Sequence, residues 1–339
     1  MAIYYRSRRR KRTRPVFLVL AAGTFAVGLW WTFLRGEVSD PVAPELALTP
    51  QPQLTTDRPD LQPTQRVDSR VSEKGDSGSP VESATPKGPT GQKAESLIEA
   101  GKQALERGDL ITARTHLSEA LRLGVKDAEL PLIRAQLTKI GAETILSGRI
   151  LTDDPLVARY IIKPGDTLGK VAKIHKVSPE LIAHINGIVD INRIRAGQTI
   201  KVVNGPFDAV VYKRDHVLEV YMGSTLVKHF SVGLGADGGT PTGEWRVGAK
   251  LVNPTYYPPR GGKIVSADDP DNPLGDRWIG LIGLSGEAAG QERYGIHGTI
   301  EPDSIGRDVS LGCVRMHNED VATLYTYLVE KHSKITIRN

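Results

Sequence analysis

An uncharged stretch of twenty residues near the N-terminus constrains this chain more than any other feature. Residues 15–34 read PVFLVLAAGTFAVGLWWTFL, and about 20 apolar residues in a helix cross a hydrocarbon core of about 30 Å. Arginine and lysine crowd residues 1–14, which predicts a basic cytoplasmic tail and places the rest of the chain outside the cytoplasm. A cleaved signal peptide is the alternative, but the stretch ends in Trp30, Trp31 and Phe33 rather than in small residues. We expect a single-pass anchor in the cell membrane, with the later domains in a periplasm or cell-wall space.

The charge distribution argues against a nucleic-acid-binding protein, and the cysteine count excludes an intramolecular disulfide. The formal net charge of +5 is concentrated in the basic tail, so a broad basic face for nucleic acid is not expected. Cys313 is the single cysteine of 339 residues, which excludes an intramolecular disulfide although the expected compartment would permit one. A lone thiol of this kind is either a buried packing residue or a group retained for its chemistry.

A linker and a helical segment follow the membrane stretch. Residues 35–90 are rich in Pro, Ser, Thr, Asp and Gln and lack aromatic residues, so they are predicted to be a disordered linker. Residues 91–148 carry apolar positions at helical spacing, and the pair Gly108-Asp109 divides them into an α-helical hairpin. The hairpin resembles one tetratricopeptide unit. Because stable solenoids need about three units, we expect a spacer or a small protein-binding module.

Residues 158–203 are predicted to form a small βααβ unit. A short apolar strand leads into the turn PGDTL, and Ser178 followed by Pro179 begins a second helix before a closing strand. The PGDTL turn, the pair Asn186-Gly187 and the late AGQTI resemble the LysM family.

That resemblance implies a non-catalytic module that binds glycan containing N-acetylglucosamine, here peptidoglycan. The family groove lies between the strand-helix turn and the second helix. The expected glycan-binding residues are Gly165, Asp166, Thr167, Leu168, Asn186 and Gly187. His175 and His184 are expected on the surface, because no acidic or cysteine partner accompanies them as a metal ligand.

Residues 207–339 change to the period-two alternation of β-strands and are predicted to form a mostly-β domain with one clear helix capped by Asn318. In this domain His297 precedes Cys313, and each has a neighbouring glycine that permits close approach of backbone to a substrate. A thiol with a pKa near 8.5 is mostly protonated at pH 7, so a nucleophilic cysteine needs a base within reach. As a bare pair this is a weak signal, since one histidine and one cysteine often occur at such a spacing.

The neighbouring sequence makes the signal specific. HGT at His297 and SLGCVRM around Cys313 resemble the active-site signature of the L,D-transpeptidase (YkuD-type) family. GTPTG, NPLG and Trp278 stand earlier in the same order, so the resemblance covers roughly residues 208–339. Leu311 stands where many family members have histidine, which affects only a secondary contact.

Carried onto this chain, the resemblance implies a thioester on Cys313 with His297 as general base. The main-chain carbonyl of Gly298 would orient His297. Gly312 and Cys313 would supply N–H groups to an oxyanion hole, and Ser310 would support their loop. The expected substrate-binding residues are Arg315, Thr299 and Trp278. No metal or cofactor is implied.

Three points stay open at this stage. Arg315 suits a stem-peptide carboxylate, but a salt bridge that fixes the loop is an equal alternative. His317 is a less favoured base, because it is expected on the far side of the loop. The segment 266–290, rich in Gly, Asp and Pro, is expected to close over the site as a lid.

A membrane tether, a glycan-binding module and an acyl-transfer domain together indicate an enzyme that remodels peptidoglycan stem peptides, in cell-wall biogenesis and cell shape. The expected product is a 3–3 cross-link, and the family resemblance also implies acylation of Cys313 by carbapenems. Hydrolysis or exchange of a D-amino acid could resolve the same thioester. A non-catalytic wall-binding anchor is the alternative from another class of protein.

Overall fold

The computed structural model describes residues 89–259 and 261–339. The predicted basic tail, membrane anchor and linker, residues 1–14, 15–34 and 35–90, lie outside this range, except that the last two linker residues begin the first helix. Among the described residues, no helix has the length and apolar character that a membrane span requires.

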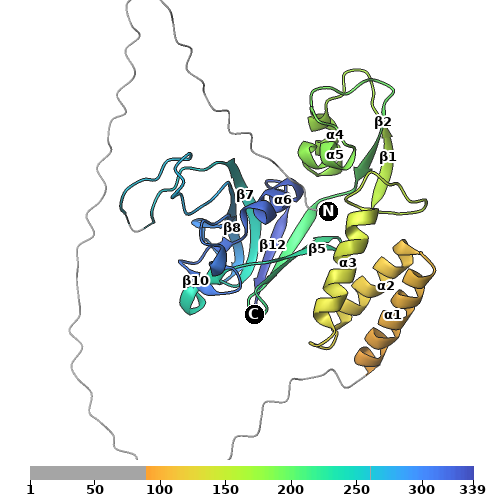
Figure 1. The fold of residues 1–339 in the computed structure, drawn as a ribbon, viewed down its shortest axis with the longest axis horizontal. Coiled ribbons are helices and arrows are strands. Elements are labelled where there is room, and N and C mark those ends of the chain that lie inside the picture. Colours follow the sequence, from red (N-terminus) through yellow and green to blue (C-terminus); the bar gives the residue numbers. More distant parts are fainter. Residues whose placement is uncertain (1–88, 260) are drawn as a thin grey trace, which may run out of the picture. The chain divides into compact units, whose positions relative to one another are not determined.

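Three helices form the first part, where the sequence predicted a hairpin of two. They are α1 (Pro89–Glu106), α2 (Leu110–Leu123) and α3 (Leu130–Thr144) (Figure 1). The side chain of Asp109 accepts a hydrogen bond from the Thr112 N–H at 3.1 Å and caps α2. The break between the first two helices is therefore where the sequence indicated it.

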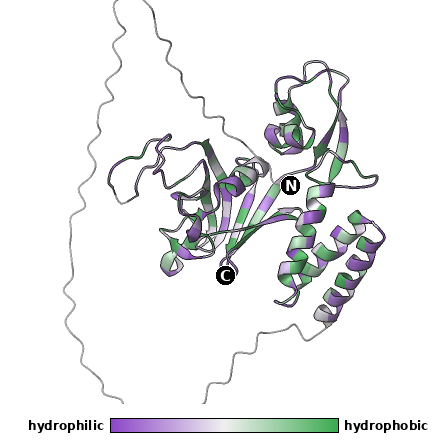
Figure 2. Ribbon diagram, viewed as in Figure 1, coloured by the Kyte–Doolittle hydropathy of each residue, from purple (hydrophilic) through white to green (hydrophobic). Residues whose placement is uncertain are grey.

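Helix α3 is the element that the hairpin prediction lacked. Its residues Ile133, Leu137 and Ile140 are buried in a cluster that also contains Leu226 from the C-terminal sheet. Figure 2 shows hydrophobic and hydrophilic residues mixed along all three helices. Because α3 packs against a distant strand as well as against its neighbours, a local repeat pattern does not reveal it.

The next part is the predicted βααβ unit. It consists of β1 (Val157–Ile161), α4 (Leu168–His175), α5 (Pro179–Ile185) and β2 (Thr199–Val203). The two strands pair antiparallel. The hydroxyls of Thr167 and Ser178 accept main-chain N–H groups at the starts of α4 and α5, as N-caps do.

An eight-stranded sheet forms the C-terminal domain, in the order β11-β9-β8-β7-β12-β3-β4-β5. Its strands are β3 (Phe207–Tyr212), β4 (Val217–Met222), β5 (Thr225–Ser231), β7 (Gly243–Val252), β8 (Arg277–Gly286), β9 (Tyr294–His297), β11 (Val314–Arg315) and β12 (Lys334–Arg338). A separate parallel pair joins β6 (Leu234–Gly235) to β10 (Asp308–Ser310). Two short 3-10 turns, η1 (Ala236–Gly238) and η2 (Pro302–Ser304), lie in the loops.

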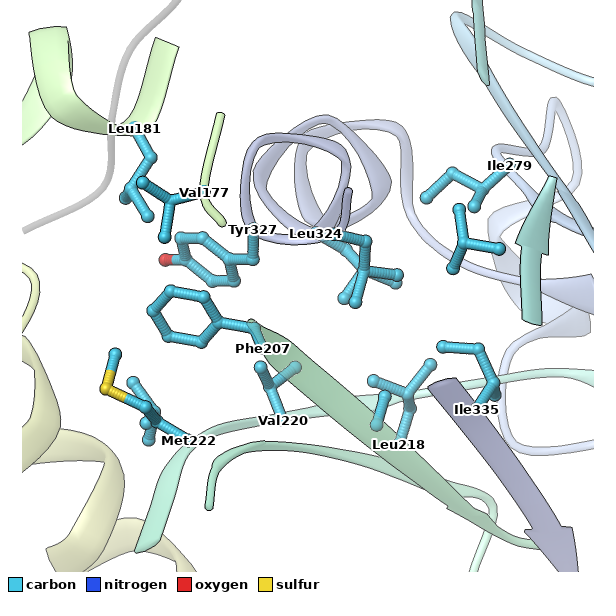
Figure 3. Close-up of a cluster of buried hydrophobic side chains, with 14 of the residues drawn as sticks. Val177, Leu181, Phe207, Leu218, Val220, Met222, Ile279, Leu324, Tyr327 and Ile335 are labelled. Atoms are coloured by element: carbon cyan, nitrogen blue, oxygen red, sulfur yellow. The ribbon is translucent and has the colours of Figure 1, made fainter. Parts of the chain in front are cut away.

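Helix α6 (Asn318–Tyr327) covers the core of this sheet. Figure 3 shows Tyr327 and Leu324 facing Phe207, Val220 and other strand residues, and the Phe207 and Tyr327 rings stack with centroids 5.6 Å apart. Val177 of the βααβ unit belongs to the same buried cluster. The core of the sheet therefore extends without interruption into the smaller unit.

Two predictions about this domain are wrong. The expected lid at residues 266–290 contains β8, an interior strand of the sheet, so only residues 266–276 and 287–290 of it are loop. Asn318 does not cap α6, because the helix already includes it and His317 takes the cap position without a side-chain hydrogen bond. The Asn318 side chain instead binds the main chain of Thr299.

Buried polar contacts join the three parts within residues 89–339. The Lys201 ammonium in β2 donates to the carbonyls of Thr144, Ser147 and Arg149. Arg134 of α3 reaches the sheet and donates to Glu219 of β4 at 2.5 Å. Buried charges need such partners, so these contacts hold the helices and the smaller unit on the sheet.

Candidate active site

Parallel pairing of β9 with β11 brings together the segments that carry the predicted nucleophile and the predicted base. Ile296 lies opposite Val314 and His297 lies opposite Arg315. Ile296 and Val314 are buried in the core. Because side chains alternate along a strand, His297 and Arg315 point from the other face of these two strands. Cys313 directly precedes β11, and the main chain of Gly295 in β9 donates a hydrogen bond to its thiol.

His297 is fixed by its own backbone neighbour. Its Nδ1–H donates to the Gly298 carbonyl at 2.6 Å, which leaves Nε2 as the free ring nitrogen. The side chain is buried, and burial lowers the pKa of His297 to about 4 against the raising effect of the Gly298 hydrogen bond. At neutral pH the ring is therefore an uncharged imidazole that can accept a proton.

The Cys313 thiol is also neutral in this site. Burial raises its pKa, although a hydrogen bond from the main chain of Gly295 and the charge of Arg315 act in the opposite direction. A neutral thiol beside a neutral imidazole differs from a preformed ion pair. The cysteine must lose its proton as it reacts.

The loop before Cys313 is held by one hydroxyl. Ser310 Oγ accepts the Gly312 N–H at 3.0 Å and donates to the Cys313 carbonyl at 2.7 Å. Gly312 has a φ of +131°, and a Cβ there would lie 2.7 Å from the carbonyl oxygen of Gly239. Only glycine fits this position. The Gly312 N–H, expected in an oxyanion hole, donates to Ser310 in this structure.

A second hydroxyl reaches the same loop from the GTPTG segment. Thr240 is 1% exposed, and its Oγ1 donates to the Gly312 carbonyl at 2.9 Å. The same oxygen accepts the Gly235 N–H at 2.8 Å. Among the described residues, no acceptor pairs with the N–H of Cys313.

Trp278 lies beside the base. It pairs with His297 across β8 and β9, and its ring stacks on the imidazole with centroids 5.8 Å apart and planes 18° apart. Gly295 makes room for the indole, since a Cβ there would lie 2.5 Å from the ring. Trp278 was expected to bind substrate, and its observed contact is instead with the base.

Arg315 and Thr299 are both engaged with the neighbouring loop. Arg315 Nη1 donates to Glu301 Oε2 at 2.7 Å, while its buried Nε has no partner among the described residues. Thr299 is buried, and its hydroxyl accepts the Glu301 N–H at 3.0 Å. The Asn318 side chain binds both the N–H and the carbonyl of Thr299 at 3.1 Å. Thr299 therefore fixes the loop, and its hydroxyl is not free for a substrate.

The expected glycan residues in the βααβ unit divide into two groups. Leu168 is 1% exposed, and the Asn186 amide is satisfied by main-chain groups of Ile182 and Lys201. Asp166 accepts the Tyr160 hydroxyl and the Lys163 N–H, which lower its pKa. Exposed groups remain at Gly165, Thr167 and, beside a cavity of about 920 Å³, at Gly187.

Comparison with known proteins identifies the family. A model of the L,D-transpeptidase catalytic domain, YkuD, matches residues 206–337, and a LysM model matches residues 160–203. YkuD of Bacillus licheniformis, assigned to the L,D-transpeptidases, is 30% identical over 187 residues, which are 52% of this chain and 97% of that protein. The chain belongs to the L,D-transpeptidase family. YkuD of Bacillus subtilis is 31% identical with the same coverage, and YqjB of Bacillus subtilis is 41% identical over 34% of this chain and 62% of YqjB.

The family resemblance seen in the sequence is thereby confirmed, and the L,D-transpeptidase domain is the mostly-β domain that carries Cys313 and His297. The contacts that two residues of that domain make with the site were not predicted from the sequence. Thr240 lies in the GTPTG segment, which matched the family order without suggesting a role, and Asn318 was taken for a helix cap. A short polar residue inside a glycine-rich segment was the only signal that could have drawn attention to Thr240.

Proposed function

We propose that this chain joins peptidoglycan stem peptides as an L,D-transpeptidase, through a thioester on Cys313, and forms 3–3 cross-links in cell-wall biogenesis. The observation that carries the proposal is the parallel pairing of β9 with β11, which places His297 opposite Arg315, two residues after Cys313. It lies within a catalytic domain of this family. Residues 15–34 would hold the enzyme in the membrane with its domains on the outer side.

The chemistry follows from two neutral groups. As the sulfur of Cys313 attacks the carbonyl carbon of the donor peptide bond, the thiol proton passes to Nε2 of His297. The imidazolium gives that proton to the departing amine as the C–N bond breaks, which leaves the thioester. An amine of a second stem peptide then attacks the thioester and loses its proton through Nε2. The new amide is released, and the thiol of Cys313 is restored.

The Gly298 carbonyl fixes which nitrogen does this work. Because Nδ1–H is held by that carbonyl at 2.6 Å, Nε2 is the basic atom throughout. When His297 becomes imidazolium, the same short hydrogen bond stabilises its charge. The developing oxyanion would meet the Cys313 N–H, the unpaired main-chain donor of the loop.

Arg315 is suited to an acidic group of the stem peptide. Its Nε is buried without a partner, while Nη1 is already paired with the exposed Glu301. A planar guanidinium two residues from the nucleophile matches a carboxylate. We assign substrate binding to Arg315 and positioning roles to Thr299 and Trp278.

The LysM unit and the helices would position the enzyme on the cell wall. The LysM unit would hold glycan strands through the exposed groups at Gly165, Thr167 and Gly187, with the cavity beside Gly187 as part of the groove. Since α3 packs on the catalytic sheet, we favour a spacer role for the helices over a protein-binding role.

Digestion of treated sacculi tests the proposal. Purified full-length protein is incubated with sacculi, and the muropeptides are separated and weighed by mass spectrometry. We expect new 3–3 dimers with the wild type and none with Cys313→Ala. Shortened stems or exchanged D-amino acids without dimers would indicate hydrolysis or exchange, and unchanged muropeptides would indicate a non-catalytic wall-binding protein.

A further inference from the structure

Thr240 contacts the nucleophile loop from a distant part of the chain. Its side chain is buried, and its Oγ1 lies 2.9 Å from the carbonyl oxygen of Gly312. The Gly235 N–H donates to that same Oγ1 at 2.8 Å. A hydroxyl has one proton. Because a donor already occupies the acceptor side of this oxygen, the proton is directed to the Gly312 carbonyl.

The Gly312 carbonyl and the Cys313 N–H belong to one peptide unit. A trans peptide is planar, and its C=O and N–H point in opposite directions. Fixing the carbonyl on the Thr240 side therefore aims the Cys313 N–H away from Thr240. Ser310 fixes the groups on either side of this unit, the Gly312 N–H and the Cys313 carbonyl.

We propose that Thr240 is a positioning residue that aims the Cys313 N–H at the carbonyl oxygen of the acyl donor. The inference rests on the proposed function, because it concerns the oxyanion formed in thioester chemistry. Thr240 touches neither the substrate nor the sulfur. It acts through the Gly312 carbonyl alone.

Thr240 is itself held in place. Lys213 Nζ donates to the Thr240 carbonyl at 2.7 Å. Gly235 lies so close to the nucleophile loop that a Cβ on it would lie 2.7 Å from the Gly312 Cα. This close approach lets β6 pair with β10 and brings Thr240 within hydrogen-bond distance of the loop.

Two reactions of the Cys313 sulfur distinguish a positioning role of Thr240 from a general structural role. Acylation of Cys313 by meropenem forms a tetrahedral oxyanion, whereas alkylation by iodoacetamide is a displacement at carbon that forms none. Cys313 is the single cysteine, so whole-protein mass follows both reactions without ambiguity. The variants are Thr240→Val, which keeps the shape and removes the hydroxyl, and Thr240→Ser, which keeps the hydroxyl.

We expect Thr240→Val to slow acylation by up to about 100-fold, the effect of losing an oxyanion donor outright, because the Cys313 N–H is no longer aimed. Alkylation should stay within about twofold of the wild type. Thr240→Ser should restore acylation to within a few-fold. Thr242→Val is the matched control, because that hydroxyl binds the surface residue Glu287. Both of its rates should equal those of the wild type.

The outcomes are distinct. Acylation of Thr240→Val at the wild-type rate, or an equal fall in both reactions, would overturn the positioning role. If Thr240→Val does not fold, the pair Thr240→Ala and Thr240→Ser differs by one oxygen and gives the same comparison. Absence of acylation in the wild type would instead count against the proposed function.

Discussion

The indole of Trp278 lies over the imidazole of His297, with ring centroids 5.8 Å apart and planes 18° apart. Cross-strand pairing of β8 with β9 sets this contact, and the absence of a side chain at Gly295 gives the indole its space. A ring that covers the base limits its rotation. The contact explains how a buried histidine keeps one orientation with a single hydrogen bond.

Replacing Trp278 with leucine should lower kcat more than it changes KM. Stacked aromatic pairs contribute about 1 kcal/mol beyond their burial, so kcat should fall by about fivefold as His297 gains freedom. Trp278→Phe keeps a flat ring and should retain most of kcat. Steady-state kinetics of both variants checks this. A rise in KM with kcat unchanged would instead return Trp278 to substrate binding.

The reactivity of Cys313 should follow the pH profile of a thiol whose pKa is ordinary or raised. Burial raises the pKa of Cys313 and lowers that of His297 to about 4. The iodoacetamide rate should therefore stay low near pH 6 and climb on the alkaline side. Transpeptidation has a different profile, because it uses His297 as a neutral base. It should be retained through mildly acidic pH and fall as pH approaches 4, where the imidazole takes up a proton. A rapid alkylation plateau between pH 5 and 7 would show a thiolate-imidazolium pair and contradict this account.

Arg315 and Glu301 form an ion pair, and replacing one residue should have a different effect from replacing the other. Arg315→Met should raise KM by roughly tenfold or more, because a charge-assisted hydrogen bond to a substrate carboxylate is worth about 1.5 to 3 kcal/mol. Glu301→Gln removes only an exposed partner, so stability should change by less than about 1 kcal/mol. KM should stay the same or fall, since the guanidinium becomes more available. If both variants lost the same amount of stability and KM stayed unchanged, the ion pair would serve only to fix the loop.

The contact between α3 and the sheet should dominate the stability of the helical part. Arg134 is the cation next to Glu219, whose carboxylate is fully buried. Arg134→Met should lower the free energy of unfolding by about 3 to 5 kcal/mol, because it leaves the buried Glu219 carboxylate without a countercharge, with the Tyr221 hydroxyl as its remaining hydrogen-bond partner. Arg122→Met is the control, since its pair with Glu119 is exposed. Chemical denaturation followed by circular dichroism measures both, and similar small effects would show that the buried pair contributes little.

The sequence by itself determined the family, and it singled out Cys313 and His297 as the proposed nucleophile and base. Those conclusions came from short motifs around Cys313 and His297, and from local periodicities that distinguish strands from helices. Such signals involve residues near one another in the chain, so they can be read without coordinates. The βααβ unit was predictable for the same reason.

Only the tertiary structure decided how the site is held. Thr240 and Gly312 are 72 positions apart and meet because β6 pairs with β10. Helix α3 was missed because its buried face is completed by a strand outside the helical segment. Asn318 looked like a helix cap but binds Thr299 instead, and the N–H of Gly312 is already taken by Ser310. Each of these depends on which polar group lies across a strand or loop, and that is fixed by packing between distant parts of the chain.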